Sequence, residues 1–91
     1  MEEYSVIELL VNNHPGVTSH VVGLFSRRAF NLEGVIGTRI GSGATSKIYL
    51  LVKNDDRLDQ IVKQLKKLYD VIEVAIHSET ECTIFNNVKE I

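Results

Sequence analysis

The chain has 91 residues, 44 % hydrophobic and 24 % charged, which is the composition of one small globular domain. Its formal net charge of −2 gives no basic surface for nucleic acid, and no apolar run is long enough to cross a bilayer. The lone cysteine excludes an internal disulfide, and residues 1–3 lack the features of a signal peptide, so we expect a cytoplasmic protein.

Hydrophobic periodicity predicts six elements. Alternating apolar residues predict strands, and apolar residues repeated at three and four positions predict helices. Turn-forming residues 12–16, with the only proline, separate the first two elements, and residues 41–43 predict a hairpin turn. The predicted elements are a strand over 4–11, a helix over 17–29, strands over 31–40 and 46–52, a helix over 57–69 and a strand over 71–76.

Five of the six predicted elements have an apolar face for the core. In the first strand Ile7, Leu9 and Val11 share this face, and Glu8 marks the other face as the wetter one. In the last strand we expect Ile72, Val74 and Ile76 to point inward. The remaining inward positions are Val17, Val21, Leu24 and Phe25 in the first helix, Ile48, Leu50 and Val52 in the third strand, and Leu58, Ile61, Val62, Leu65 and Leu68 in the second helix.

The element order is β-α-β-β-α-β, which predicts the α+β class. It is typical of a ferredoxin-like sandwich, with an antiparallel sheet and both helices on one face. We place the domain at residues 1–76 and a C-terminal tail at 77–91. The tail carries Ile84, Phe85, Val88 and Ile91, and it either docks on the domain or a partner, or frays.

The second and fourth strands lie at the edges of such a sheet. The second strand is apolar up to Arg39, except for Glu33 at its start, and an exposed edge of this kind invites aggregation. Pairing with the same edge of another copy would cover it, so we expect a homodimer with two-fold symmetry.

The sequence gives little support for a catalytic or a metal-binding site. His14, His20 and His77 have no cysteine or carboxylate at a metal-ligand spacing. Cys82 has no evident basic neighbour to activate it as a nucleophile. We therefore expect neither catalytic nor metal-binding residues.

The loop Asn13–Val17 is the best candidate for a binding site. It leads into a helix N-terminus, whose unpaired N–H groups can donate hydrogen bonds to a carboxylate, and Gly16 allows that carboxylate to approach closely. The side-chain amide of Asn13 can serve both the ammonium and the carboxylate of an amino acid. An ordinary turn has the same sequence features, and Asn31 is either a helix cap or a polar contact across a dimer interface.

A longer pattern surrounds this loop. Residues 13–17 (NHPGV) and 22–34 (VGLFSRRAFNLEG) resemble the ACT domain of acetohydroxyacid (acetolactate) synthase small subunits, and the similarity continues through 46–52 and 64–71. The pattern G-L-F-S-R-R-x-F/Y-N-x-E is far more specific than a Pro-Gly turn. Many members carry a second C-terminal domain that this chain lacks, so it is similar to the short, isozyme I-like type.

The resemblance implies a non-catalytic regulatory subunit in branched-chain amino-acid biosynthesis. Such a subunit activates a catalytic large subunit and makes it sensitive to valine; the thiamine diphosphate, Mg²⁺ and FAD belong to that partner, and none to this chain. A free-standing ACT-type amino-acid sensor or a dimerisation module are the alternatives.

The resemblance also implies a ligand site shared by two protomers. Asn13 and Asn31 would hold the polar groups of the ligand. The other implied site residues are Gly16, Val17 and Thr18, through backbone N–H groups, and Ile36 and Thr38, from the neighbouring protomer. Thr18 stands where longer relatives usually have leucine, so packing around the ligand would differ.

Overall fold

The computed structural model describes residues 3–86 and contains the six predicted elements in the predicted order. They are β1 (Tyr4–Asn12), α1 (Val17–Arg27), β2 (Leu32–Ile40), β3 (Thr45–Lys53), α2 (Leu58–Lys66) and β4 (Val71–Ser78). Both helices end earlier than predicted. In α2 the reason is that the N–H groups of Lys67 and Leu68 donate to carbonyls three residues back, which tightens the last turn.

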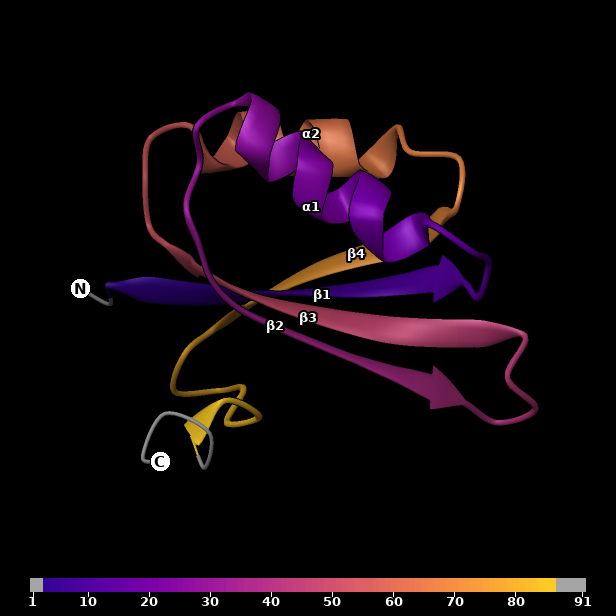
Figure 1. Ribbon diagram of the computed structural model, residues 1–91. Coiled ribbons are helices and arrows are strands. Elements are labelled where there is room, and N and C mark those ends of the chain that lie inside the picture. Colours follow the sequence, from indigo (N-terminus) through magenta and orange to yellow (C-terminus); the bar gives the residue numbers. More distant parts are fainter. Residues whose placement is uncertain (1–2, 87–91) are drawn as a thin grey trace.

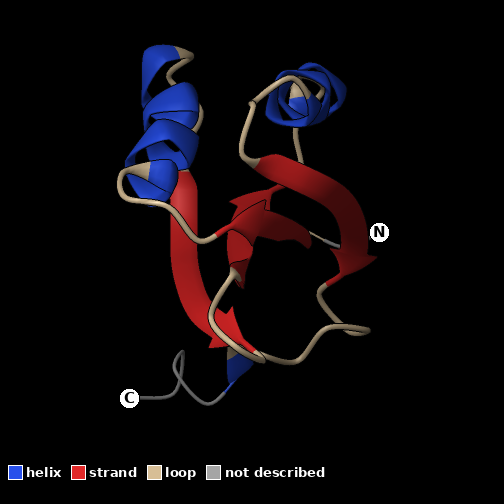
Figure 2. Cartoon of the chain, turned by 90° about the vertical axis from the view of Figure 1, so that its right-hand side faces the viewer, coloured by secondary structure: helices blue, strands red, loops and turns tan. Residues whose placement is uncertain are grey.

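The strands form one antiparallel sheet in the order β2-β3-β1-β4, so β2 and β4 are the edge strands, as predicted. Both helices lie on one face of this sheet (Figure 1), and the view along the sheet shows the two layers clearly (Figure 2). The α+β, ferredoxin-like architecture is confirmed.

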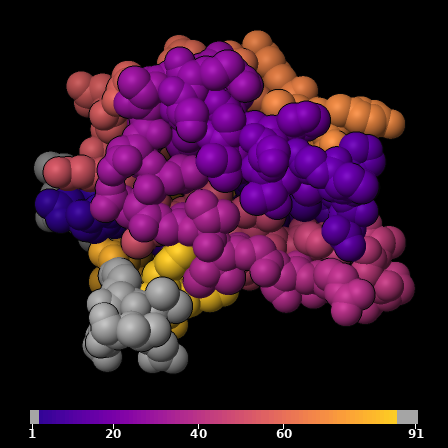
Figure 3. Space-filling model, viewed as in Figure 1, coloured from indigo at the N-terminus to yellow at the C-terminus, as the bar shows by residue number. Residues whose placement is uncertain are grey.

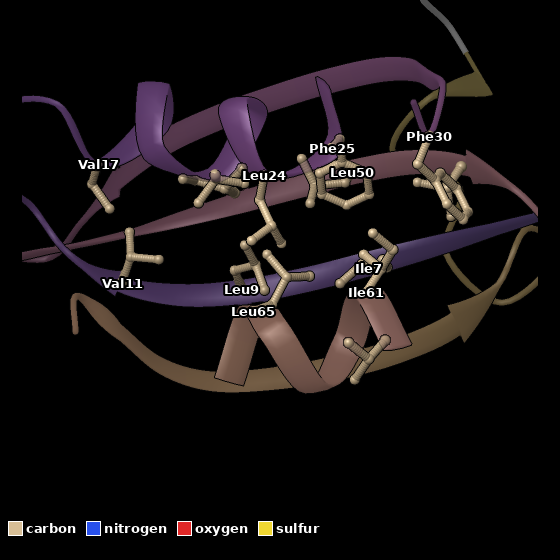
Figure 4. Close-up of a cluster of buried hydrophobic side chains, with 14 residues drawn as sticks. Ile7, Leu9, Val11, Val17, Leu24, Phe25, Phe30, Leu50, Ile61 and Leu65 are labelled. Carbon is tan, nitrogen blue, oxygen red and sulfur yellow. The ribbon is translucent and has the colours of Figure 1, made fainter. Parts of the chain in front are cut away.

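The main core fills the space between the helices and the sheet (Figure 4). On β1, Ile7, Leu9 and Val11 have no exposed surface, and Figure 4 shows them among side chains that come from both helices. Full burial of one aliphatic side chain contributes about 1.5–3 kcal/mol, so this strand anchors the packing. The helix residues that complete the core are Val17, Val21, Leu24, Phe25, Ile61, Val62 and Leu65.

A second apolar cluster lies on the helix-free face of the sheet. Its centre consists of Val6, Leu51 and Phe85, which are at most 5 % exposed. Phe85 belongs to the tail, so residues 79–86 dock on the sheet, and Figure 1 shows them below it (yellow). The face marked by Glu8 is therefore polar only in part. The tail residues Val88 and Ile91 lie outside the described residues.

A hydrogen-bonded turn directs the tail onto this face. The backbone N–H of Ser78 donates to the Glu81 carboxylate at 3.0 Å, and the Glu81 N–H donates to the Ser78 hydroxyl at 3.2 Å. The bond from the Ser78 N–H lowers the pKa of Glu81. The turn thus reverses the chain after β4 and brings Phe85 back over β2 and β3.

Phe85 approaches β2 at Gly34. A Cβ atom at position 34 would lie 2.8 Å from Cε1 of Phe85 and 3.5 Å from Cβ of Leu51. The first distance is well inside van der Waals contact, so the aromatic ring occupies space that only glycine leaves free.

One prediction about β4 is wrong. Val74 packs against the core, but Ile72 is 49 % exposed and Ile76 is 47 % exposed. An irregularity in the pairing with β1 places Val71 opposite Val11, so Ile72 is the extra residue of a bulge and leaves the core. Ile76 does share the helix-side face of β1, but at the edge of the sheet it is only half covered.

The contact between Phe85 and Gly34 gives a stability prediction. Phe85→Ala should lower the free energy of unfolding by about 3–5 kcal/mol, since it empties a buried aromatic site. Gly34→Ala should be destabilising in the native chain and much less so in the Phe85→Ala background. Urea unfolding of the four chains measures the coupling. Gly37→Ala is the control, because its Cβ would meet nothing closer than 4.0 Å; equal costs for the two glycine substitutions in the native chain would contradict the prediction.

Candidate functional site

The loop between β1 and α1 has the geometry of an open helix start. Gly16 has φ of +88°, and a Cβ there would meet nothing within 4 Å. The Val17 N–H donates to the His14 carbonyl at 3.2 Å, and no side chain caps the helix among the described residues. The N–H groups of Thr18 and Ser19 have no acceptor within the helix, because they lie in its first turn. These groups can bind an anion.

Asn13 fastens this loop to the hairpin between β2 and β3. Its backbone N–H donates to the Ala44 carbonyl at 3.0 Å, and its side-chain Nδ2 donates to the Gly43 carbonyl at 2.7 Å. One of the two N–H groups of the Asn13 side-chain amide is therefore already bonded within the chain and is not free to bind a ligand. The side-chain carbonyl oxygen is the atom of Asn13 suited to accept from an ammonium group.

A hollow of about 260 Å³ lies between the start of α1 and the end of β2. It brings together four of the predicted site residues, Asn13, Val17, Thr18 and Thr38, all from one chain, whereas Thr38 was expected from the neighbouring protomer. Figure 3 shows α1 (violet) and β2 (magenta) meeting on the visible face. The other residues that line the hollow, which sequence reasoning missed, are Gly37, Arg39, Ser46 and Ile48.

The register of β2 explains why Gly37 and Arg39 line the hollow although the sequence analysis did not include them. Gly37 lies opposite Ile48 and Arg39 opposite Ser46, which places them on the helix side of the sheet. Gly37 has no side chain, so the space above it stays open. Strand alternation was the available signal, since residues 37 and 39 have the parity opposite to that of Ile36.

Three predicted site residues do not line this hollow. Gly16 lies in the loop beside it. Asn31 lies beyond the far end of α1 from this hollow. Because α1 has 11 residues, its two ends are about 16 Å apart. Asn31 donates to the Glu33 carboxylate. Ile36 packs against the second apolar cluster, which contains Phe85, on the helix-free face of the sheet.

Asn31 is one of the residues that line a second, larger hollow of about 510 Å³. Its wall is the turn after α1, where the Ala29 N–H donates to the Ser26 carbonyl and the Phe30 N–H to the Phe25 carbonyl. This pairing is a Schellman motif, and Ala29 holds the left-handed position with φ of +53°. Glycine usually occupies this position, so an alanine here stores strain beside Asn31.

Both hollows include residues of β2, which is an edge strand: Leu32 lines the larger one, and Gly37, Thr38 and Arg39 line the other. Within residues 3–86, β2 pairs only with β3, so its outer N–H and C=O groups have no strand partner. Val35 on this edge is 41 % exposed. The edge is thus free to pair with another strand.

The helix-free face carries a charged group of its own. Glu8 lies between Lys47, at 2.6 Å from Nζ to Oε2, and His77, at 2.8 Å from Nε2 to Oε1. The hydrogen bond from Lys47, with a further contribution from His77, lowers the pKa of Glu8. These contacts tie β1 to both of its neighbours and give the group a structural role.

Residues 3–86 contain neither a metal-binding cluster nor a helix that could cross a membrane. No three side chains of His, Cys, Asp or Glu are arranged to hold a metal ion. Neither helix combines the length and the apolar character that a membrane span requires.

Comparison with known proteins places this geometry in a family. Residues 7–73 match the AHAS small subunit-like ACT domain. The acetolactate synthase isozyme 1 small subunit of Escherichia coli (strain K12) is 47 % identical over 83 residues, which are 91 % of this chain and 85 % of that protein. A probable acetolactate synthase small subunit of Methanothermobacter thermautotrophicus is 43 % identical over 70 residues, 76 % of this chain and 42 % of that protein.

A solved structure agrees. The acetolactate synthase small subunit from Thermotoga maritima superposes with a TM-score of 0.71 at 35 % identity, over 80 % of this chain and 46 % of that one. The strand order, the helix placement and the strand–loop–helix start define an ACT domain. The chain belongs to the family of acetolactate synthase small subunits, as the sequence pattern predicted.

The Glu8 contacts predict a pH dependence. The pKa of Glu8 is lowered from its ordinary value of about 4.5, so its contribution to stability is complete above that value and is lost as the pH falls through the lowered pKa. Glu8→Gln should therefore lose less stability than the native chain between about pH 5 and about pH 2. Thermal unfolding across this range measures the difference. Asp56→Asn, in the exposed turn before α2, is the control and should follow the native curve; a Glu8→Gln curve that follows it too would refute the prediction.

Proposed function

We propose that this chain is the regulatory, non-catalytic subunit of an acetolactate synthase and binds valine, or a related branched-chain amino acid, between two copies of itself. Binding would serve feedback inhibition, and the subunit would also activate the catalytic large subunit that its family name implies. The observation that supports this most directly is a hollow that is lined by the uncapped start of α1, by Asn13, whose side-chain oxygen can accept a hydrogen bond, and by residues of the edge strand β2.

The chemistry of the hollow suits a small aliphatic amino acid. The first-turn N–H groups of α1 are suited to the carboxylate, and the Asn13 side-chain oxygen to the ammonium group. Val17 and Ile48 supply apolar surface for the ligand side chain. Thiamine diphosphate, Mg²⁺ and FAD would be held by the catalytic partner, and the cytoplasmic location belongs to the same proposal.

A two-fold dimer would complete the site. If β2 pairs antiparallel with β2 of a second copy, the Leu32 end of one strand lies beside the Ile40 end of the other. The hollow around Asn31 of one protomer then adjoins the hollow around Asn13 of its partner. This arrangement accounts for the separation of Asn13 and Asn31 within one chain. The assignments of Gly16, Ile36 and Thr38 stay predictions of this dimer.

Gly16→Asp tests the ligand site. The new carboxylate would lie where the ligand carboxylate binds, so we expect valine affinity to fall at least about tenfold while the fold persists. Isothermal titration calorimetry measures the affinity. The matched control is Gly41→Asp in the hairpin, which also has positive φ and no atom within 4 Å of the added Cβ. Unchanged valine affinity in Gly16→Asp, or an equal loss in the control, would show that the loop is not the site.

Mixing with the catalytic subunit tests the regulatory role. Adding the chain should raise the rate of acetolactate formation, and valine should lower the rate of the complex. Linkage requires that the catalytic subunit alter valine affinity by the reciprocal factor, typically about 1–3 kcal/mol. A chain that binds valine but leaves the rate unchanged would instead be a free-standing sensor, and one that binds neither valine nor enzyme would be a dimerisation module.

A further inference from the structure

The edge strand β2 carries two charged residues of opposite sign. Glu33 lies three residues before Ile36, Arg39 lies three residues after it, and no other residue of β2 or of the hairpin 41–44 is charged. Both charged residues are exposed, and neither has an ion-pair partner among residues 3–86. A strand with this pattern is complementary to a second copy of itself that runs in the opposite direction.

The two charges select one register for the pairing of β2 with β2 of a second copy. Residues directly opposite each other in an antiparallel pair have side chains on the same face, so the two-fold axis must pass through a residue and not between two residues. An axis at Ile36 places Glu33 opposite Arg39 at both ends of the pairing. An axis one residue earlier or later moves each charge two positions along the partner strand, where it meets an uncharged residue.

Both charged side chains lie on the helix side of the sheet. Arg39 is opposite Ser46, and it lines the hollow at Asn13 together with residues from the start of α1. Glu33 lies at the irregularity in the pairing with β3 and has no partner residue there. Its carboxylate accepts from Asn31, which lines the larger hollow together with residues of α1. The two groups are therefore in the same layer and can meet across a dimer interface.

Such an ion pair would join the two asparagines of the proposed ligand site. A Cβ atom on Gly43 would lie 3.6 Å from Cδ of Arg39, and the Gly43 carbonyl accepts from the side chain of Asn13. With the axis at Ile36, the partner's Asn31 lies opposite residue 41, at the start of the same hairpin. The pair thus connects the group that holds Asn13 in one copy to the carboxylate that holds Asn31 in the other.

The same register gives the hollow an apolar wall from the partner. Val35 is 41 % exposed, and it lies on the helix side of β2 because it is opposite Leu50 of the main core. An axis at Ile36 places the partner's Val35 opposite Gly37, the lining residue of the hollow that has no side chain. A Cβ atom on Gly37 would meet nothing closer than 4.0 Å, so the partner's side chain has room there.

These observations specify how two copies meet, and the assignment rests on the proposed function, in which two copies share the ligand. We infer that the β2 edge binds a second copy of this chain in the register centred on Ile36, held by two ion pairs between Glu33 of one copy and Arg39 of the other. Val35 of each copy then completes the amino-acid site of its partner.

Charge reversal tests the register with the full chain and without any ligand. Arg39→Glu brings two pairs of like charges together at the interface, and so does Glu33→Arg. Each variant alone should therefore raise the dimer dissociation constant at least about tenfold at low salt, and added salt should reduce the difference. Sedimentation velocity measures the constant. The control is Lys63→Glu, which makes the same change of charge at an exposed position of α2 and should dimerise like the native chain.

A mixture of the two variants separates the ion pairs from any effect on folding. A dimer with one chain of each variant again has opposite charges at both ends, as does the double variant Glu33→Arg, Arg39→Glu. Both should dissociate with a constant within about threefold of the native value. Native mass spectrometry identifies the mixed dimer. If Glu33→Arg does not fold, Glu33→Lys takes its place in the mixture with the same expectation.

Val35→Ser tests the contribution of the partner to the ligand site. At chain concentrations well above the dimer dissociation constant, it should weaken valine binding at least about threefold, because the ligand side chain loses an apolar contact. Isothermal titration calorimetry measures the affinity. The matched control is Ile72→Ser on the other edge strand, where the isoleucine is 49 % exposed, and it should keep the native affinity.

Several outcomes would overturn the inference. Single variants that dimerise like the native chain, a mixture that forms no mixed dimer, or a native chain that stays monomeric would each exclude the register. Unchanged valine affinity in Val35→Ser would exclude the partner's valine from the site. The dimer measurements contain no amino acid, so a chain that dimerises as expected but binds no valine would refute the proposed function and leave the register in place.

Discussion

Burial of β1 on both faces holds the domain together. Its helix-side residues lie beneath α1 and α2, and on the other side Val6 is closed off by the tail. Its two neighbours take their register from it, and the Glu8 contacts with Lys47 and His77 fasten both of them to it. A strand packed so completely cannot shift, so variation and exposure are left to the two edges. The β2 edge is where the domain meets a second copy in our proposal.

Most of the fold could be predicted because periodicity reports which face of an element is buried. The six elements, their order and the two edge strands follow from alternation in the strands and helical spacing in the helices. The departures have local causes that periodicity does not encode. The bulge beside Val71 inserts one residue, and Ala29 adopts a backbone conformation that glycine usually occupies. The contact of Phe85 with Gly34 joins residues far apart in sequence, so no local sequence pattern predicts it.

Only part of the candidate site could be predicted from the sequence. The loop at Asn13 could be proposed from the chemistry of a helix start, and one hollow does unite Asn13, Val17, Thr18 and Thr38. Asn31 lies beyond the other end of α1, so the helix separates it from the other predicted site residues at the Asn13 loop. In the proposed dimer, a site divided in this way would make ligand affinity depend on association, so dimer formation and amino-acid binding would strengthen each other.

The position of Phe85 bears on where this domain ends as a folding unit. The family match stops at residue 73 and β4 at Ser78, yet the apolar surface of Val6 and Leu51 is closed by a residue further along the chain. A truncation chosen from the last strand would expose this surface and favour aggregation. Fusion tags are therefore better attached at the N-terminus.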